Sequence, residues 1–354
     1  MEESKQKITI MDVARLAGVS KGTVDRVLHN RGEVSRKSEE KVKRVIEELG
    51  YEPNLYASLL ASKKRHCIAC LLPEYEKGEY WERIKEGLDK SEDMLRQFNI
   101  QLELFSYEQY STDSFRDACN ALIASEPSAV ILPPLFKNDT RLFTSELVKK
   151  GIPYIFIDTK IEDDSYFAYF GMPMYQSGYL CAHLLTDRMK EGEVKEVALV
   201  RIQRDKARQS DPTINRRAGF TDYLSEHYPD CRINNIFINP NSSDETKCIL
   251  DEYFKEHEFK FVVMLNSRIH LISDHLPQSK RSGNTRVVGF DDLEKNMLAL
   301  RSGNIDILIT QHTENQSFNA VQCLIDYLLM HKVPAKKDNF MHMDILTRLN
   351  SDYY

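Results

Sequence analysis

Short or basic side chains line one side of a helical segment near the start of the sequence. The segment reads KGTVDRVLHN over residues 21–30, and Val24, Val27 and Leu28 recur at helical spacing on its other side. The outer side carries Lys21, Gly22, Thr23, Arg26 and Asn30. Lysine and arginine pair with the O6 and N7 acceptors of guanine, so this side has the chemistry of a DNA-recognition helix. A helical hairpin without a nucleic-acid role is the alternative explanation of the pattern.

A second set of polar and aromatic residues lies where apolar runs end or helices begin. Its members are Tyr80, Trp81, Arg216, Asn266, Asp291 and Gln311. Carboxylate, amide and guanidinium groups together supply the donors and acceptors that hydroxyl groups need, and an aromatic face suits the C–H face of a sugar ring. Each residue alone is also compatible with an ordinary loop position. As a set at the carboxyl ends of parallel strands, they predict a pocket for a sugar or related polyol.

Two short helices must position the first set. Thr9 can cap a helix over 10–17, Gly18 ends it because glycine takes a left-handed backbone cheaply, and Ser20 caps the next helix. This is the helix-turn-helix plan, in which the second helix lies in the major groove. The stretch SRKSEEKVKRVIEELG (35–50) predicts a third helix that closes the small core.

The charge distribution agrees with that plan. Residues 1–65 hold 14 lysines and arginines against 10 acids, in a chain whose net charge is −6. A basic end on an acidic body favours contact of that end with DNA.

The stretch from Met11 to Lys64 resembles the DNA-binding head and hinge of the lactose-repressor (LacI) family of bacterial transcription regulators. The motifs V-A-x-x-A-G-V-S, T-V-x-R-V, V-S and G-Y-x-P-N follow one another in order. The resemblance implies a homodimer that binds a near-palindromic DNA operator. By position, it implies base-edge contacts for Lys21, Gly22 and Arg26. It implies phosphate contacts for Thr9, Ser20, Thr23 and Asn30, and a minor-groove wedge for Leu60.

Two residues depart from the family pattern. Gly22 offers no side chain for base readout. Asp25 stands where a small hydroxyl residue is usual. Its carboxylate either accepts a hydrogen bond from cytosine N4 or repels phosphate and tunes affinity, and the sequence leaves both readings open.

From His66 onward, short apolar runs alternate with amphipathic stretches. This alternation predicts parallel sheets with right-handed crossovers. The expected fold class is therefore α/β: a small all-α helix-turn-helix head and a two-lobed body of parallel sheets flanked by helices. The body resembles the periplasmic-binding-protein type I module that the same family carries. By position, this resemblance implies ligand contacts for Tyr80, Trp81, Arg216, Asn266 and Asp291.

The expected domains are a DNA-binding head (1–52), a hinge helix or linker (53–65) and an effector-binding and dimerisation body (66–354). Lobe 1 is expected at about 66–158 and 311–336, and lobe 2 at about 159–290 and 337–354. The chain should cross between the lobes near 158–165, 290–292 and 309–313.

One loop leaves the charge of the ligand open. The stretch RIQRDKARQSDP (201–212) carries Arg201, Arg204, Lys206 and Arg208. It is compatible with a solvated basic loop, or with an anionic ligand such as a sugar acid or sugar phosphate.

Composition argues against several classes of protein. The start, MEESKQKIT, has no apolar run of a secretory signal, and no window approaches about 18 apolar residues, so we expect a cytoplasmic protein without a membrane span. Seven scattered cysteines suit reduced thiols. The C-x-x-C of Cys67 and Cys70 is interpreted as strand core, and the histidines lack metal-ligand spacing. We expect no metal and no cofactor.

Together these features predict a ligand-responsive transcription regulator, a repressor of carbohydrate-utilisation genes. It would bind double-stranded operator DNA as a homodimer and a sugar-like effector between its lobes. A response to a sugar acid or sugar phosphate is one alternative. A sugar-metabolising enzyme with a DNA-binding head is another, but no phosphate-loop or nucleophile motif supports it, and no catalytic residue is assigned. An exported sugar-binding protein is disfavoured by the head, and inducer and corepressor roles both stay open.

Overall fold

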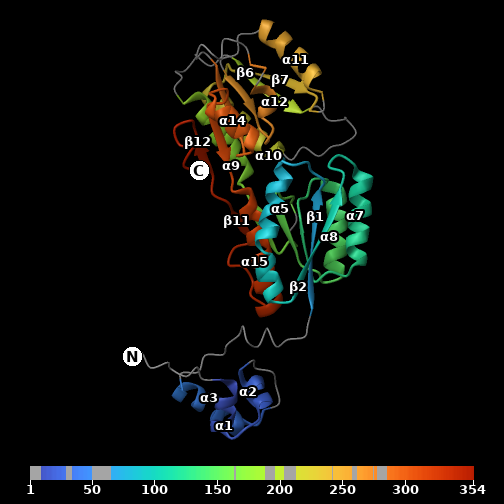
Figure 1. Cartoon of the computed structure of the whole chain (residues 1–354), viewed down its shortest axis with the longest axis vertical. Coiled ribbons are helices and arrows are strands. Elements are labelled where there is room, and N and C mark those ends of the chain that lie inside the picture. Colours follow the sequence, from blue (N-terminus) through green and yellow to red (C-terminus); the bar gives the residue numbers. More distant parts are fainter. Residues whose placement is uncertain are drawn as a thin grey trace. The chain divides into compact units, whose positions relative to one another are not determined.

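Figure 1 shows a computed structural model of the chain, which describes residues 9–28, 34–49, 65–162, 165–187, 196–202, 213–240, 242–256, 261–273, 275–276 and 285–354. The chain divides into two compact units, Met1–Lys64 and Arg65–Tyr354. Each unit has its own hydrophobic core, so we describe the two units separately.

The first unit is a bundle of three helices, α1 (Ile10–Ala17), α2 (Lys21–Leu28) and α3 (Arg36–Leu49). Thr9 caps α1: its hydroxyl accepts from the Asp12 amide, and its own amide donates to the Asp12 carboxylate at 3.0 Å. Gly18 ends α1 with a left-handed φ of 65°. Seven small apolar side chains from the three helices form the core: Val13, Ala14, Ala17, Val24, Val27, Val42 and Val45. The predicted helix-turn-helix is confirmed.

The first sheet of the second unit has six parallel strands. In spatial order they are β11 (Asp338–Phe340), β5 (Ala168–Gly171), β4 (Tyr154–Asp158), β3 (Ala129–Leu132), β1 (His66–Pro73) and β2 (Ile100–Tyr107). Its helices are α5 (Tyr80–Lys90), α6 (Glu92–Gln97), α7 (Thr112–Ala124), α8 (Lys137–Lys149) and α15 (Thr313–Met330). In Figure 1, α5 and α15 lie side by side, with α7 and α8 across the sheet from them. Strands and helices share one core.

The second sheet repeats this plan. In spatial order its strands are β12 (Asp344–Leu346), β10 (Ile307–Thr310), β9 (Arg286–Phe290), β8 (Phe261–Met264), β6 (Glu196–Ile202) and β7 (Arg232–Ile238). Only β12 runs antiparallel to its neighbour. The helices are α9 (Met174–Thr186), α10 (Ile214–His227), α11 (Ser243–Glu256), α12 (His270–Ser273) and α14 (Glu294–Arg301).

Alternate side chains along the strands of the second sheet pack into two different hydrophobic cores, one on each face of the sheet. Val197 and Leu199 of β6 pack with α9 and α10, whereas Ala198 and Val200 pack with α11, α12 and α14. Side chains of a strand alternate between faces, so a strand covered on both sides must be apolar throughout. The expected α/β fold class is confirmed. Within the described residues, no helix is both long enough and apolar enough to cross a lipid bilayer.

The expected lobe boundaries need three corrections. β5 pairs with β4 in the first sheet, so residues 168–171 do not belong to lobe 2, and the crossing lies after Gly171 instead of near 158–165. β9 and β10 are neighbours in the second sheet, so no crossing occurs near 290–292. β11 likewise joins the first sheet, which moves residues 338–340 out of lobe 2 and puts another crossing between β11 and β12. Apolar strand patterns mark burial but not which of two similar sheets a strand joins.

Two glycines bring α9 and α10 into backbone contact. A Cβ at Gly178 would lie 1.7 Å from the carbonyl oxygen of Arg216, and a Cβ at Gly219 would lie 2.0 Å from that of Tyr175. Neither helix tolerates a side chain at these positions without moving away from the other. The contact therefore fixes the first turn of α10, where Arg216 lies.

We predict that Gly178→Ala destabilises the second unit by about 1–3 kcal/mol, because the added methyl group overpacks a backbone contact. Chemical denaturation followed by circular dichroism measures the change. Gln176→Ala, at an exposed position of α9, is the control and should stay within about 0.5 kcal/mol of wild type. Equal stability of Gly178→Ala and wild type would contradict the argument.

Candidate functional site

The first candidate site is the outer face of α2. Lys21, Gly22 and Arg26 are exposed there, while Val24 and Val27 face the core. The Ser20 hydroxyl accepts from the Thr23 amide at 3.1 Å, which satisfies one of the free N–H groups at the start of α2. The face therefore presents two basic side chains on a helix whose inner side is anchored.

The proposed phosphate contacts have partners of their own in this unit. The Thr9 hydroxyl donates to the Asp12 carboxylate at 2.7 Å, and this bond is the main reason why the Asp12 pKa lies below its ordinary value. The hydroxyls of Ser20 and Thr23 lie 2.9 Å apart and share a hydrogen bond. Asn30 and Leu60 lie outside the described residues.

The second candidate site is a cavity of about 360 Å³ in the second unit. All six residues of the predicted ligand set line it: Tyr80, Trp81, Arg216, Asn266, Asp291 and Gln311. Tyr80 and Trp81 begin α5, which packs on the first sheet, and Arg216 lies in α10. Asn266, Asp291 and Gln311 follow the carboxyl ends of β8, β9 and β10 in the second sheet. Ligand sites of open parallel sheets lie at these strand ends.

Arg216 is buried but has an incomplete set of acceptors. Its Nε donates to the Ser177 hydroxyl at 3.0 Å and its Nη1 to the Leu265 carbonyl at 2.7 Å. Its Nη2 meets two thioether sulfurs, those of Met172 at 3.4 Å and Met174 at 3.3 Å. Sulfur is a weak acceptor, so Nη2 is able to donate to a stronger acceptor in the cavity.

Two buried carboxyl groups share the cavity with this guanidinium. Burial raises the pKa of Asp158, against the opposing effects of the Tyr80 hydroxyl and Arg216. Burial raises the pKa of Asp291 to about 7, although Arg216 and Gln311 oppose the shift. Both residues have left-handed φ angles, 64° and 67°, at the ends of their strands. Such strained backbone is common where a side chain is aimed at a ligand.

The sequence patterns do not single out Asp158, although it ends the strand run PYIFID just as Asp291 ends VVGFD. An acid directly after a buried strand was the available signal. Other cavity residues without a clear sequence signal are Glu79, Gln109, Tyr110, Phe136, Asn239, Arg268 and His270.

The aromatic residues differ in exposure. Trp81 is 5% exposed and packs into the first core, with its ring edge-on to Tyr80 at a centroid distance of 5.1 Å. The Tyr80 hydroxyl donates to Asp158 at 2.7 Å and accepts from Gln311 at 3.2 Å. Tyr80 thus contributes polar chemistry, and Trp81 contributes an apolar wall.

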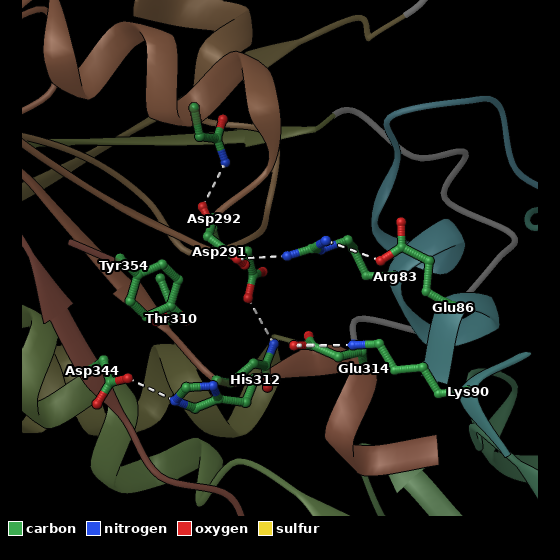
Figure 2. Close-up of polar contacts among 12 residues, drawn as sticks. Arg83, Glu86, Lys90, Asp291, Asp292, Thr310, His312, Glu314, Asp344 and Tyr354 are labelled. Atoms are coloured by element: carbon green, nitrogen blue, oxygen red, sulfur yellow. Dashed lines mark hydrogen bonds and ion pairs between the residues drawn. The ribbon is translucent and has the colours of Figure 1, made fainter. Parts of the chain in front are cut away.

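Ion pairs and hydrogen bonds join the two lobes around the cavity. Arg83 of α5 binds Asp292 at 2.9 Å, and Arg268 binds Glu79 at 2.8 Å (Figure 2 shows the first pair). At the lobe crossings, Nε2 of His312 lies 2.6 Å from Oδ2 of Asp344 (Figure 2). Asp292, next to the cavity residue Asp291, is therefore an interlobe contact.

Two other sequence features lie away from the cavity. Arg201 donates to Asn235 at 3.5 Å and covers the ring of Phe237, while Arg204, Lys206 and Arg208 lie outside the described residues. Cys67 and Cys70 are both in β1, three positions apart, so their side chains point to opposite faces of the strand. Burial raises the Cys67 pKa to about 11. The interpretation of these cysteines as strand residues agrees with the structure.

Comparisons with known proteins agree on one family. Residues 9–54 match the model described as bacterial regulatory proteins, lacI family, and residues 68–332 match the periplasmic binding protein domain. A solved structure titled as a "putative LacI transcriptional regulator" from Bacteroides fragilis is 34% identical, with a TM-score of 0.76, covering 82% of this chain and 100% of that chain.

Other relatives share shorter or more distant similarity. The ribose operon repressor of Lactococcus lactis is 33% identical over 37% of this chain and 38% of its own length. The matches span 26% to 38% of the first curated relatives. A solute binding protein from Agrobacterium radiobacter, solved with D-arabinose, is 17% identical with a TM-score of 0.68, covering 82% of this chain and 96% of that chain, and shares the fold.

A helix-turn-helix unit joined to a two-sheet unit of the periplasmic-binding-protein type defines a class of bacterial regulatory proteins. Within that class, the chain belongs to the LacI family.

We predict that Asp291→Asn changes how stability depends on pH. Because burial raises the folded-state pKa of Asp291 above its ordinary value of 3.8, the folded state holds a proton that the unfolded state releases. This contribution is complete below about pH 4 and is lost as the pH rises to about 7, with a slope of at most about 1.4 kcal/mol per pH unit. Denaturation at a series of pH values should show a flatter profile for the variant.

The control for this series is Asp93→Asn, at an exposed position of α6. It should keep the wild-type profile. A profile for Asp291→Asn that parallels wild type between pH 4 and pH 7 would show that Asp291 is not the buried titrating group.

Proposed function

We propose that this protein is a transcription regulator, a repressor of carbohydrate-utilisation genes. It binds a palindromic DNA operator as a homodimer, with α2 in the major groove, and it binds a sugar-like effector in the cavity between the lobes. The observation that carries the proposal is the convergence of six polar and aromatic residues, separated by more than 200 positions in the sequence, on one cavity.

The cavity chemistry supports an uncharged polyol. Two carboxyl groups accept hydrogen bonds from hydroxyls, the Arg216 guanidinium donates to them, and Trp81 forms an apolar wall. A volume of about 360 Å³ suits a small ligand. Several relatives are named as ribose, ribitol or sucrose operon repressors, which agrees with this class of effector.

An anionic sugar is the second candidate, because Lys77 and Lys295 also line the cavity and are exposed. The two carboxyl groups at the buried end of the cavity disfavour the binding of an anionic sugar there. An anion placed between Asp158 and Asp291 would add a third negative charge where burial already disfavours two.

The regulatory mechanism is a shift between lobe arrangements. A ligand that contacts both lobes stabilises the arrangement in which those contacts form, and it changes DNA affinity only to the extent that this arrangement binds DNA differently. A coupling of about 1–3 kcal/mol would change operator affinity about 5–150-fold. Operator titrations with and without ligand distinguish an inducer from a corepressor.

We predict that Arg26→Ala lowers affinity for selected genomic operator fragments about 10–100-fold, because it removes a base-edge contact. Affinity for random duplex DNA should change much less. Fluorescence anisotropy at fixed salt concentration measures both. Arg44→Ala removes a similarly exposed arginine from α3 and is the control. Unchanged operator preference in Arg26→Ala would exclude the proposed recognition face.

We predict that an effector changes the fluorescence of Trp81, which is the single tryptophan of the chain and lines the cavity. The probes are D-ribose, D-arabinose, ribitol and sucrose. Arg216→Ala should weaken the binding of the active probe about 10–100-fold, since it removes a charged hydrogen-bond donor. Arg217→Ala, which alters a residue outside the cavity lining, should keep the affinity. A probe that binds without changing the fluorescence would place the site elsewhere.

A further inference from the structure

A chain of hydrogen bonds runs behind the cavity and begins at a backbone group. The amide N–H of Asp158 donates to Oε1 of Gln316 at 2.9 Å. A backbone N–H is only a donor, so this bond fixes which end of the Gln316 amide is the oxygen. Gln316 lies on α15, is fully buried, and is absent from the cavity lining.

The direction of each following bond is then determined. Nε2 of Gln316 donates to Oε1 of Gln311 at 3.2 Å, which leaves the Nε2 of Gln311 on the other side. That Nε2 donates to Asp291 at 2.9 Å and to the Tyr80 hydroxyl at 3.2 Å. The Tyr80 hydroxyl, having accepted this bond, donates to Asp158 at 2.7 Å. The chain of bonds thus returns to the residue where it started.

The ring leaves little room for the opposite orientation. If the Gln311 amide rotated by half a turn, its oxygen would face the Asp291 carboxylate and its NH₂ group would face the NH₂ group of Gln316. Gln311 and Gln316 are 1% and 0% exposed, so water has little access to replace the lost bonds. A buried polar group without a partner is costly, so one orientation is strongly favoured.

We propose that Gln316 is a positioning residue that sets the orientation of the Gln311 amide and so turns this end of the cavity into a set of acceptors. Gln311 and Tyr80 direct their donor hydrogens at Asp291 and Asp158, and both carboxyl groups line the cavity. The site then binds polyols, whose hydroxyls donate hydrogen bonds, more tightly than the corresponding acids. This statement about the ligand rests on the proposed function.

A purely structural role for Gln316 predicts something different. Gln316 would then only satisfy the N–H of Asp158, and its loss would lower stability without changing the electrostatics of Asp291. The two roles are separated by the pKa of Asp291, because a donor hydrogen bond from Gln311 lowers that pKa and its loss raises it.

The test is a double-mutant cycle in the full-length protein. Gln316→Met removes both amide groups without adding a charge, and Gln311→Met removes the amide that is oriented. The pKa of Asp291 is followed by NMR on protein labelled with carboxyl-¹³C aspartate, with Asp291→Asn as the assignment standard. Asp158, Asp292, Arg216 and Tyr80 are the charged or titratable groups that act on Asp291, and all stay in place in these variants.

We expect Gln316→Met to raise the Asp291 pKa by about one pH unit in the wild-type background and to leave it unchanged when Gln311 is already methionine. Gln322→Met, the same substitution at an exposed position of α15, is the control for changes on that helix. No change in the first variant, or an equal change in both backgrounds, overturns the proposal.

A measurement on the wild-type protein covers the case in which Gln316→Met does not fold. The side-chain amide protons of Gln311 should show nuclear Overhauser effects to the Tyr80 ring. Nuclear Overhauser effects from the Gln311 amide protons to the Gln316 side chain, and none to the Tyr80 ring, would mean that the Gln311 amide has the opposite orientation. That result overturns the proposal.

The ligand arm uses D-arabinose and D-arabinonate as a matched pair. We expect D-arabinose to bind at least tenfold more tightly than the acid in wild type, and Gln316→Met to weaken D-arabinose about tenfold. Tighter binding of the acid overturns the ligand part of the inference. If neither probe nor any of the other sugars binds, the proposed function fails, while the Asp291 pKa cycle still decides the role of Gln316.

Discussion

The arrangement of the body depends on holding two buried carboxyl groups beside one guanidinium. Asp158 comes from the first sheet, Asp291 from the second, and Arg216 from a helix that covers the second sheet. Bringing these charges out of water is unfavourable unless they are close and hydrogen-bonded. The hydrogen bonds of Tyr80 and Gln311 and the ion pairs of Arg83 and Arg268 hold the two lobes together around these groups.

Much of this was accessible from the sequence, because local rules determined it. Caps, a glycine turn and helical spacing specify the head, and polar and aromatic residues at strand ends and helix starts identify six members of the cavity lining. The features that the sequence does not predict depend on contacts between residues far apart in the chain. Nothing in the AYFG segment shows that it pairs with β4 rather than opening the second lobe, since both sheets demand the same apolar strand. Gln316 was equally hidden: its role comes from a partner 158 positions away, at the backbone of Asp158.

The hydrogen-bond ring also connects recognition with lobe geometry. Gln311 follows β10 of the second sheet, and Gln316 lies in the first turns of α15, which packs on the first sheet. The segment between them is a lobe crossing, and His312 within it has a left-handed φ of 49° and pairs with Asp344 near another crossing. The hydrogen bonds of Gln311 therefore lie next to a segment that connects the two lobes.

The contact between Gly178 and Gly219 has a practical consequence for anyone who wants to redesign this protein as a biosensor. Because α9 and α10 meet through backbone atoms, the backbone position of Arg216 does not depend on the other side chains that line the cavity. The guanidinium is a fixed anchor, and exposed lining residues such as Lys77 and Lys295 form a replaceable border around it. A library that varies the border and preserves both glycines should retain the fold while exploring new analytes.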